Sequence, residues 1–336
     1  MAHDLLFELG CEELPPKALK NLAIALERGV VEGLEQAGLQ HGATKWYATP
    51  RRLALWIEGL AARQPDKRIE RRGPAVQAAF DASNQPTQAA LGFARSCGVG
   101  IEQLQRLKTD KGEWLAHTLT ESGQPTTELI PDILEIALKR LPIPKRMRWG
   151  DRETSFIRPV HWVVLLFGEE IIPCNILGIA AGNTTRGHRF HAPQPIQLNR
   201  ASKEEYEEKL KESKVIADFA ERKRRINDGI VSEAKRAKGL AMSTEWGGSV
   251  LTEEITSINE WPTAILCQYD KRFLNLPREV LISELRVHQR CYEVADPDTI
   301  LEKPRLLPYF ITVSNIESKK AECVKTGNER VIRARF

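Results

Sequence analysis

The sequence predicts an α+β fold, with mixed or antiparallel sheets packed against helices and more than one domain. A length of 336 residues is enough for two or three domains. Residues 17–37 carry apolar side chains at helical spacing, and residues 160–167 are apolar at every position except His161. The second pattern is typical of a strand covered on both faces. Residues 168–170 then turn the chain toward a hairpin partner over residues 171–179.

Other elements of the first half follow from the same periodicities. We expect a strand at 5–9, the helix at 17–37, and a strand that is entered through Pro50-Arg51-Arg52 and alternates from Leu53 to Ile57. A charged connection at 63–74, an interrupted helix over 75–106, a turn and strand at 111–119, and an amphipathic helix at 127–140 should follow. Pro142 and Pro144 stop that last helix, because proline cannot continue it.

A composition shift near residue 194 predicts a domain boundary, since the most charged stretch follows over residues 202–238. Ser202 and Asp218 are capping residues, so we expect two helices there. The cations of the second helix stand close to acids, which favours a solvated helix over a phosphate track. We predict domains at 1–193 and 194–329, followed by a basic tail at 330–336.

Composition excludes several classes of protein. The hydrophobic fraction of 42% and the charged fraction of 28% are those of a globular protein, and no apolar run approaches the roughly 20 residues of a membrane span. The acidic N-terminus is unlike a signal peptide, so we expect a cytoplasmic protein without a membrane partner. Six scattered cysteines without a Cys-x-x-Cys pair indicate reduced thiols and no zinc ribbon.

Two loops concentrate cations and aromatic residues, although the net charge is only +4. The first contains Lys145, Arg146, Arg148 and Trp149, and the second runs over residues 182–191. Cations neutralise phosphates and an indole stacks on an unpaired base, so both loops fit an RNA surface at one sheet end. A solvated basic turn is an equally weighted alternative for the first loop.

Signatures of a self-sufficient enzyme are missing from the sequence. It contains no phosphate loop, no Gly-x-Gly-x-x-Gly, no nucleophile elbow and no zinc helix. His188 and His191 are three residues apart, but two imidazoles without a carboxylate or thiolate make an incomplete metal site. His288 is a candidate general base, with a capping or core role favoured because it has no evident partner.

Ordered sequence blocks nevertheless carry a strong resemblance. They are Glu12-Glu-Leu-Pro-Pro-Lys17-Ala, Thr49-Pro-Arg-Arg-Leu-Ala54, Arg72-Gly-Pro-Ala75, Gly112-Glu-Trp114, Leu141-Pro-Ile-Pro-Lys145, Met147-Arg-Trp-Gly150, Phe156-x-Arg-Pro-Val-His161, Arg186-Gly-His-Arg-Phe190, Glu260-Trp-Pro262, Val287-His-Gln-Arg290 and Gly327-Asn-Glu-Arg330. Over nearly the whole chain they resemble the bacterial glycyl-tRNA synthetase beta subunit.

That resemblance implies an assembly of two alpha and two beta subunits. The alpha subunit would bind glycine and ATP, with Mg²⁺, and would make the adenylate, while the beta subunit recognises tRNA(Gly). This chain would therefore hold no cofactor and would not be catalytic alone. Family members continue into an HD-type domain and an anticodon-binding domain. The resemblance therefore implies that this chain is an N-terminal piece, and that residues 330–336 begin the connection to a missing C-terminal half.

The leading expectation is that basic loops grip the tRNA backbone and steer its acceptor end. The residues predicted to contact tRNA are Arg51, Arg52, Lys145, Arg146, Arg148, Trp149, Arg186, His188 and Arg189. One alternative is an assembly module whose Arg and Trp residues contact another subunit. Another is a cryptic editing site around His188, His191 or His288, which the resemblance of this half to an editing-associated domain of the phenylalanyl-tRNA synthetase beta subunit keeps open.

Overall fold

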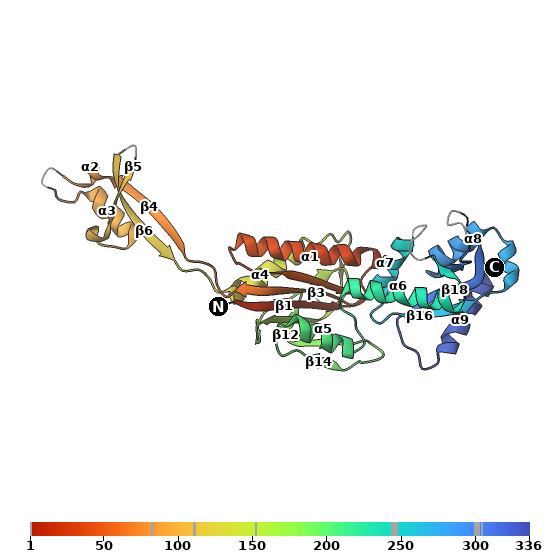
Figure 1. Ribbon diagram of the computed structural model, residues 1–336. Coiled ribbons are helices and arrows are strands. Elements are labelled where there is room, and N and C mark those ends of the chain that lie inside the picture. Colours follow the sequence, from red (N-terminus) through yellow and green to blue (C-terminus); the bar gives the residue numbers. More distant parts are fainter. Residues whose placement is uncertain are drawn as a thin grey trace.

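The computed structural model describes residues 2–81, 84–109, 112–151, 153–242, 248–298, 303 and 305–336. Three units follow one another along the molecule: an arm, a central unit and a C-terminal unit (Figure 1). Helices and predominantly antiparallel sheets occur in separate stretches, which confirms the predicted α+β class. Among the described residues, no helix is long and apolar enough to cross a membrane.

The central unit is built on one mixed sheet with the strand order β11-β12-β9-β1-β3-β2, and β10 pairs with β9. Its strands are β1 (Ala2–Cys11), β2 (Thr44–Thr49), β3 (Arg52–Ala61), β9 (Val160–Phe167), β10 (Glu170–Ile171), β11 (Asn175–Ile176) and β12 (Ile179–Gly182). Strand β1 runs antiparallel to both β3 and β9, whereas β12 is parallel to β9. The predicted hairpin after β9 is therefore only the short β10, because the chain crosses to a parallel edge.

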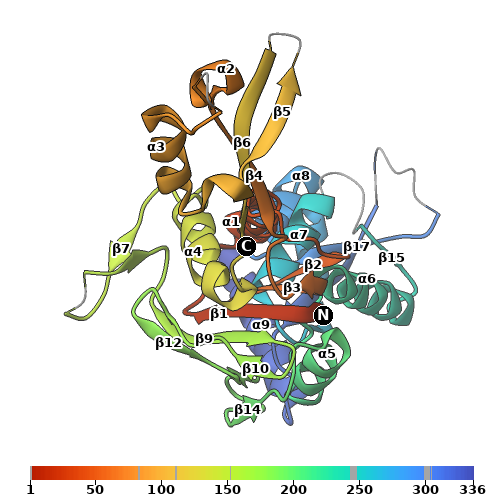
Figure 2. The same cartoon turned by 90° about the vertical axis from the view of Figure 1, so that its left-hand side faces the viewer.

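Both faces of this sheet are covered, as the apolar run of β9 predicts. Helices α1 (Pro16–Gln36) and α4 (Thr126–Lys139) pack on one face, and α5 (Lys203–Glu212) packs on the other (Figure 2). The hairpin of β13 (Thr184–Arg186) and β14 (Pro195–Gln197) lies on the α5 side, where Ile196 joins that core. The predicted helix over 17–37 is confirmed with its apolar stripe buried.

The predicted strand after Pro50-Arg51-Arg52 is confirmed as β3, and the residues before this turn form a second strand, β2, which pairs with β3. Pro50 and Arg51 form the turn, and Thr49 pairs with Arg52. Proline lacks a backbone N–H and has a fixed φ, so it ends the first strand rather than entering the second. The residues after the turn are buried on both faces of the sheet.

The arm contains the stretch predicted to be a charged connection. It comprises β4 (Lys67–Ala75), α2 (Val76–Ala79), α3 (Gln88–Cys97), the 3₁₀ turn η1 (Ile101–Gln103), β5 (Gln105–Thr109) and β6 (Gly112–Glu121). The strand order is β4-β6-β5, and a small core forms around Ala79, Ala90 and Leu115. The prediction of an unstructured connection was wrong for a physical reason. Strand β4 is exposed along most of its length, so its sequence does not show the alternation of apolar and polar residues that indicates a strand.

The C-terminal unit has a four-stranded antiparallel sheet with the order β15-β17-β18-β16. Its elements are α6 (Phe219–Arg236), β15 (Leu240–Ala241), α7 (Gly248–Ile258), β16 (Thr263–Gln268), η2 (Lys271–Asn275), α8 (Arg278–Ser283), the π-helical turn η3 (Glu284–His288), β17 (Tyr292–Ala295), β18 (Leu306–Ser314) and α9 (Ala321–Arg335). Residues 330–335 thus end a helix. The predicted boundary near 194 precedes α5, whose Tyr206 and Leu210 pack on the central sheet, and we propose that the central unit extends to about Ala217.

Gly10 lets an indole lie flat across the central strand β1. A Cβ atom at position 10 would lie 1.8 Å from Cε2 of Trp162. We expect Gly10→Ala to lower the free energy of unfolding by about 1–3 kcal/mol, because overpacking forces the ring or the strand to move. Denaturant titration of the variant measures this change.

The matched control is Gly92→Ala in α3, where nothing lies within 4 Å of a new Cβ. Alanine there should stabilise the helix slightly, because glycine loses more backbone entropy on folding. Equal unfolding midpoints for the two variants would contradict the packing assigned to Trp162.

Candidate nucleic-acid interface

Four of the predicted cations meet at the end of the central sheet that faces the C-terminal unit. Arg51 lies in the β2–β3 turn and Arg52 is the first residue of β3. Arg186 is the last residue of β13, and Arg189 lies in the loop that follows. Trp162 in β9 is the common neighbour of three of them: its ring centroid lies 5.6 Å from the Arg51 guanidinium, 5.9 Å from that of Arg52 and 6.0 Å from that of Arg186. Cations at such distances are attracted by the ring quadrupole.

Two of these cations have no ion-pair partner among the residues that the structure describes, namely Arg51 and Arg186. Arg186 is exposed, and Arg51 is half-buried with an Nε atom that lacks a hydrogen-bond partner. Burial lowers the pKa of Arg51, which nonetheless stays a cation because an arginine pKa begins so high. These two cations are therefore not neutralised by a direct ion pair, although the more distant carboxylates of Glu260 and Glu12 favour the charge of Arg51.

Arg189 is held differently, by the carboxylate of Glu12. Its Nη2 donates to Oε2 of Glu12 at 2.7 Å, and the other oxygen of Glu12 lies 3.0 Å from Nε2 of His161. The hydrogen bond from Arg189 lowers the pKa of Glu12. Since this pair is exposed, solvent screens it and Arg189 keeps only part of its charge for another anion.

Arg52 is fully buried, which corrects its predicted place on an RNA-gripping loop. Its guanidinium donates to Oγ1 of Thr49 at 3.1 Å and to the carbonyl of Arg186 at 2.7 Å. It also forms ion pairs with Glu8 at 3.4 Å and Glu260 at 3.5 Å. Burial lowers the pKa of Arg52, but the two carboxylates outweigh burial and raise it overall. Its donors face protein acceptors, so none reaches a phosphate.

Glu8 is the central acceptor of this buried group. Besides Arg52, it accepts hydrogen bonds from Trp162 Nε1, Thr185 Oγ1 and the Tyr206 hydroxyl. These donors come from β9, β13 and α5, so one carboxylate joins the sheet to the layer that covers it. The same bonds fix the indole on which Arg51 and Arg186 lie.

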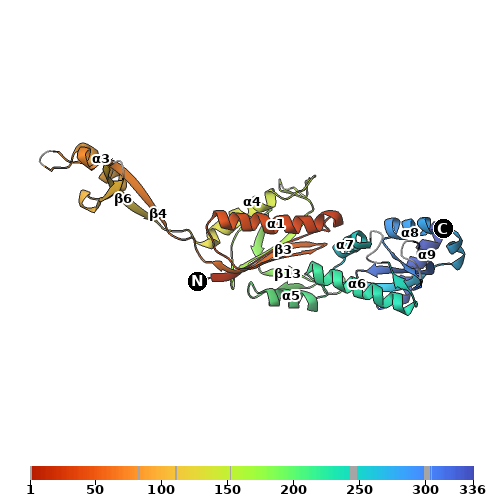
Figure 3. The same ribbon diagram turned by 45° about the horizontal axis from the view of Figure 1, so that its top comes forward.

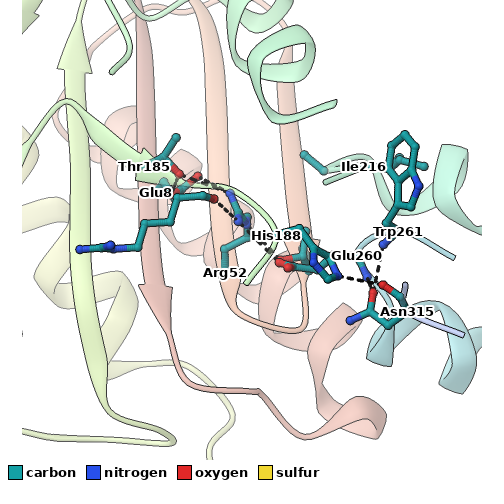
Figure 4. Close-up of polar contacts among 12 residues, drawn as sticks. Glu8, Arg52, Thr185, His188, Ile216, Glu260, Trp261 and Asn315 are labelled. Atoms are coloured by element: carbon teal, nitrogen blue, oxygen red, sulfur yellow. Dashed lines mark hydrogen bonds and ion pairs between the residues drawn. The ribbon is translucent and has the colours of Figure 1, made fainter. Parts of the chain in front are cut away.

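Glu260 continues the network into the C-terminal unit, as Figure 4 shows. Its Oε1 accepts from Oγ1 of Thr49 at 2.9 Å. The backbone N–H groups of Glu260 and Trp261 donate to Oδ1 of Asn315, at 2.7 Å and 3.1 Å. The two units therefore meet through polar groups that are satisfied only when the units are docked.

His188 is buried, with 1% of its surface exposed, and this corrects its predicted contact with tRNA. Its Nε2 lies 2.8 Å from the Asn315 carbonyl, and its Nδ1 accepts from the backbone N–H groups of Phe190 and His191 at 3.3 Å each. This arrangement assigns a neutral ring protonated on Nε2. Burial lowers the pKa of His188, an effect that Glu260 and the Asn315 carbonyl only partly oppose.

Arg222 is a second buried cation between the units, and sequence reasoning missed it by counting it among solvated charges. Its guanidinium donates to the carbonyls of Ala48, Ile216 and Thr256 at 2.5, 2.6 and 3.0 Å. Burial lowers the pKa of Arg222 to about 10. Its position in the apolar register of α6, with Phe219, Ile226 and Ile230, was the available signal.

The Lys145 loop forms a short hairpin of β7 (Met147–Arg148) and β8 (Ser155–Phe156). Lys145 and Arg148 are exposed, as predicted for a basic loop. Arg146 instead donates to the carbonyls of Leu138 and Lys139 at 3.2 and 3.0 Å, which caps the C-terminal end of α4. Trp149 packs partly against the central core, which limits the face it offers to a base. The tRNA contacts of Lys145 and Arg148 stay predictions.

The histidines are not part of a cluster of metal ligands in the described part of the chain. The rings of His188 and His191 are 4.8 Å apart, but no group of three or more His, Cys, Asp or Glu side chains placed to hold a metal ion is found there. His191 Nε2 accepts from the N–H of Glu317 at 3.0 Å, and His288 is exposed on η3. The editing alternative stays an untested prediction.

Comparison with known proteins settles the family. A family model described as glycyl-tRNA synthetase beta subunit matches residues 5–336. The chain belongs to the glycyl-tRNA synthetase beta subunit family. It is 52% identical to the glycine–tRNA ligase beta subunit of Hahella chejuensis, over 99% of this chain and 47% of that relative.

Two further beta subunits of this family are similar. The chain is 49% identical to the glycine–tRNA ligase beta subunit of Marinobacter nauticus, over 99% of this chain and 47% of the relative. It is 48% identical to that of Chromohalobacter salexigens, over 99% of this chain and 46% of the relative. The chain therefore spans slightly less than half the length of these family members.

Arg52→Met should lower the free energy of unfolding by about 3–5 kcal/mol, because it leaves Glu8 and Glu260 buried without their cation. Arg51→Met is the matched neighbour, and we expect it to cost less than about 1 kcal/mol because Arg51 makes no ion pair with any residue that the structure describes. Thermal and urea unfolding measure both. Similar losses for the two variants would refute the role given to Arg52.

The stability of the chain should also depend on the neutral state of His188. The pKa of His188 is lowered from its ordinary value of 6.5, so the unfolded chain binds this proton more tightly. Its contribution is therefore fully present above about pH 6.5 and declines as the pH falls below that value. Urea titrations between pH 7.5 and pH 5 should show a decline that His188→Gln reduces and His288→Gln leaves unchanged; an equal decline in all three proteins would contradict it.

Proposed function

We propose that this chain is the N-terminal part of the beta subunit of a glycine–tRNA ligase, and that its sheet end binds the phosphate backbone of tRNA(Gly). The observation that carries the proposal is the placement of Arg51 and Arg186 over Trp162 without carboxylate partners among the described residues. Backbone contacts by arginine position an RNA without reading its sequence.

The buried network beneath the sheet end supports this role. Glu8 orients Trp162, and Arg52 binds the carbonyl of Arg186. The exposed cations thus lie on groups that are already fixed, so binding loses less conformational entropy. Trp162 itself is only 6% exposed, which makes it a support for the cations rather than a stacking platform.

The proposal extends to a partner, since the relatives are named beta subunits. We propose that a glycyl-tRNA synthetase alpha subunit, in a 2:2 assembly in the cytoplasm, binds glycine and uses ATP with Mg²⁺ to form the adenylate. The residues of this chain would hold and orient the RNA and carry out no bond-making step. Bringing two reactants together in a fixed geometry is itself a large contribution to rate.

An assembly role is the second candidate, and one observation favours it. Phe190 follows Arg189 in the chain and is 78% exposed. Leaving so large an apolar ring in water is unfavourable, so its exposure indicates a surface that contacts another molecule. Aromatic residues and arginines are enriched at the centres of protein interfaces. On this alternative the same sheet end would contact another subunit.

The decisive variant is Arg51→Gln/Arg186→Gln, titrated with fluorescent tRNA(Gly) at several salt concentrations. We expect weaker binding and a slope of log affinity against log salt that is smaller by about two, one unit per lost phosphate contact. Lys145→Gln/Arg148→Gln tests the β7–β8 hairpin separately and leaves the Arg146 cap intact. The control, Arg28→Gln/Arg236→Gln, removes equal charge from cations already paired with Glu32 and Glu233.

An unchanged affinity and salt slope for Arg51→Gln/Arg186→Gln would remove the sheet end as an RNA contact. If Phe190→Ser lowered association with the alpha subunit in the absence of RNA, while RNA binding persisted, the assembly role would replace it.

A further inference from the structure

The arm lies far from the sheet end and is joined to the central unit only by a narrow neck. Figures 1 and 3 show its strands reaching away from the central unit, opposite the C-terminal unit. Two chain segments form the neck, where Arg63 bridges to Pro125 and the N–H of Gln64 donates to the carbonyl of Gln124 at 3.0 Å. A surface on the arm therefore meets a different part of any large ligand than the sheet end does.

Helices cover only one face of the arm sheet. Leu115 points into the small core with Ala79 and Ala90, and a Cβ atom at Gly73 would lie 2.5 Å from Cδ1 of Phe93 in α3. Because alternate residues of a strand face opposite sides, Arg68, Glu70 and Arg72 point away from these helices. We call this side of the sheet the open face.

The register of β4 on β6 shows what the open face presents. Arg68 pairs with Thr120, and Glu70 pairs with Thr118. Next to Arg72 lies Trp114, whose ring centroid is 3.5 Å from the guanidinium carbon. Arg68, Thr118 and Thr120 are exposed, and neither Arg68 nor Arg72 has an ion pair within the described ranges.

Cations on an edge strand also protect a sheet from pairing with another chain. That explanation suits β4 as an edge strand, but such protection would work equally well with the cations on either face of the sheet. The open face instead combines Arg68, the guanidinium of Arg72 stacked on an indole, and the hydroxyls of two threonines, with the carboxylate of Glu70 between the two arginines. This combination is the chemistry that recognises a ribose-phosphate surface, because arginine binds phosphate and hydroxyls bind the 2′-OH.

We propose that the open face of the arm binds the backbone of a double-stranded RNA segment across its minor groove. The minor groove of A-form RNA is wide and shallow, displays 2′-hydroxyls, and is bordered by phosphates, so a flat sheet face can lie on it. Arg68 and Arg72 are four residues apart, about 13 Å along the strand, which is enough to contact separate phosphates. The inference rests on the proposed function in that a tRNA supplies such duplex segments.

The test uses the whole chain and three fluorescent probes: tRNA(Gly), a short blunt RNA duplex, and a DNA duplex of the same sequence. Arg68→Gln/Arg72→Gln should weaken binding of the RNA duplex roughly ten-fold at low salt and reduce the salt slope by about two. Binding should also favour the RNA duplex over the DNA duplex, and Thr118→Val/Thr120→Val should reduce that preference.

The matched control is Arg106→Gln/Lys108→Gln on β5, which removes equal charge from the other face of the same sheet. There Arg106 lies 5.7 Å from the Phe80 ring and Lys108 pairs with Glu113 at 3.1 Å. Arg72→Lys keeps the charge and should keep the salt slope. Circular dichroism and unfolding midpoints establish that each variant is folded.

Unchanged binding by Arg68→Gln/Arg72→Gln, alongside weakened binding by Arg51→Gln/Arg186→Gln, would overturn the arm proposal and leave the proposed function standing. Unchanged binding by both would overturn both. If the β5 control lost as much affinity for the RNA duplex, the effect would come from total charge and not from the open face, which overturns the proposal. If sedimentation showed that the arm variant lost only protein association, the open face would be a protein interface, which also overturns the proposal.

Discussion

Burial of the Arg52 guanidinium is the constraint on which the arrangement of the central and C-terminal units depends. A buried cation is tolerated only when acceptors surround it, and Arg52 takes them from Glu8 in β1, Thr49 in β2 and Glu260 beyond α7. Glu8 and Thr49 belong to the central sheet, whereas Glu260 reaches Arg52 only when the C-terminal unit is docked. The relative placement of the units is therefore tied to satisfying one charge.

The same constraint explains how a surface can be both charged and ordered. Exposed arginines ordinarily lose side-chain freedom when they bind an anion. Here Glu8 holds the indole of Trp162, and Arg52 holds the backbone of Arg186, so Arg51 and Arg186 lie on a fixed base. Buried polarity under the sheet end thus contributes to the proposed RNA contact without touching RNA.

Sequence reasoning succeeded where one physical signal dominated. The stripe of α1 and the continuous apolar run of β9 were sufficient because a buried helix face and a doubly covered strand each have a distinct pattern. It failed at β4, where a paired strand is exposed and charged, and at Arg52 and Arg222, which were taken for surface cations because arginine is usually exposed.

By itself, the sequence determined the α+β class, the positions of several helices and strands with a clear apolar pattern, and the beta subunit family, because these depend on local periodicity and on ordered residue blocks. Only the tertiary structure decided which arginines are exposed and which are enclosed. Arg51 and Arg52 are neighbours in the chain, yet one lies at the surface and the other is fully buried. Acceptors brought from distant segments make that difference, and sequence order does not record such proximity.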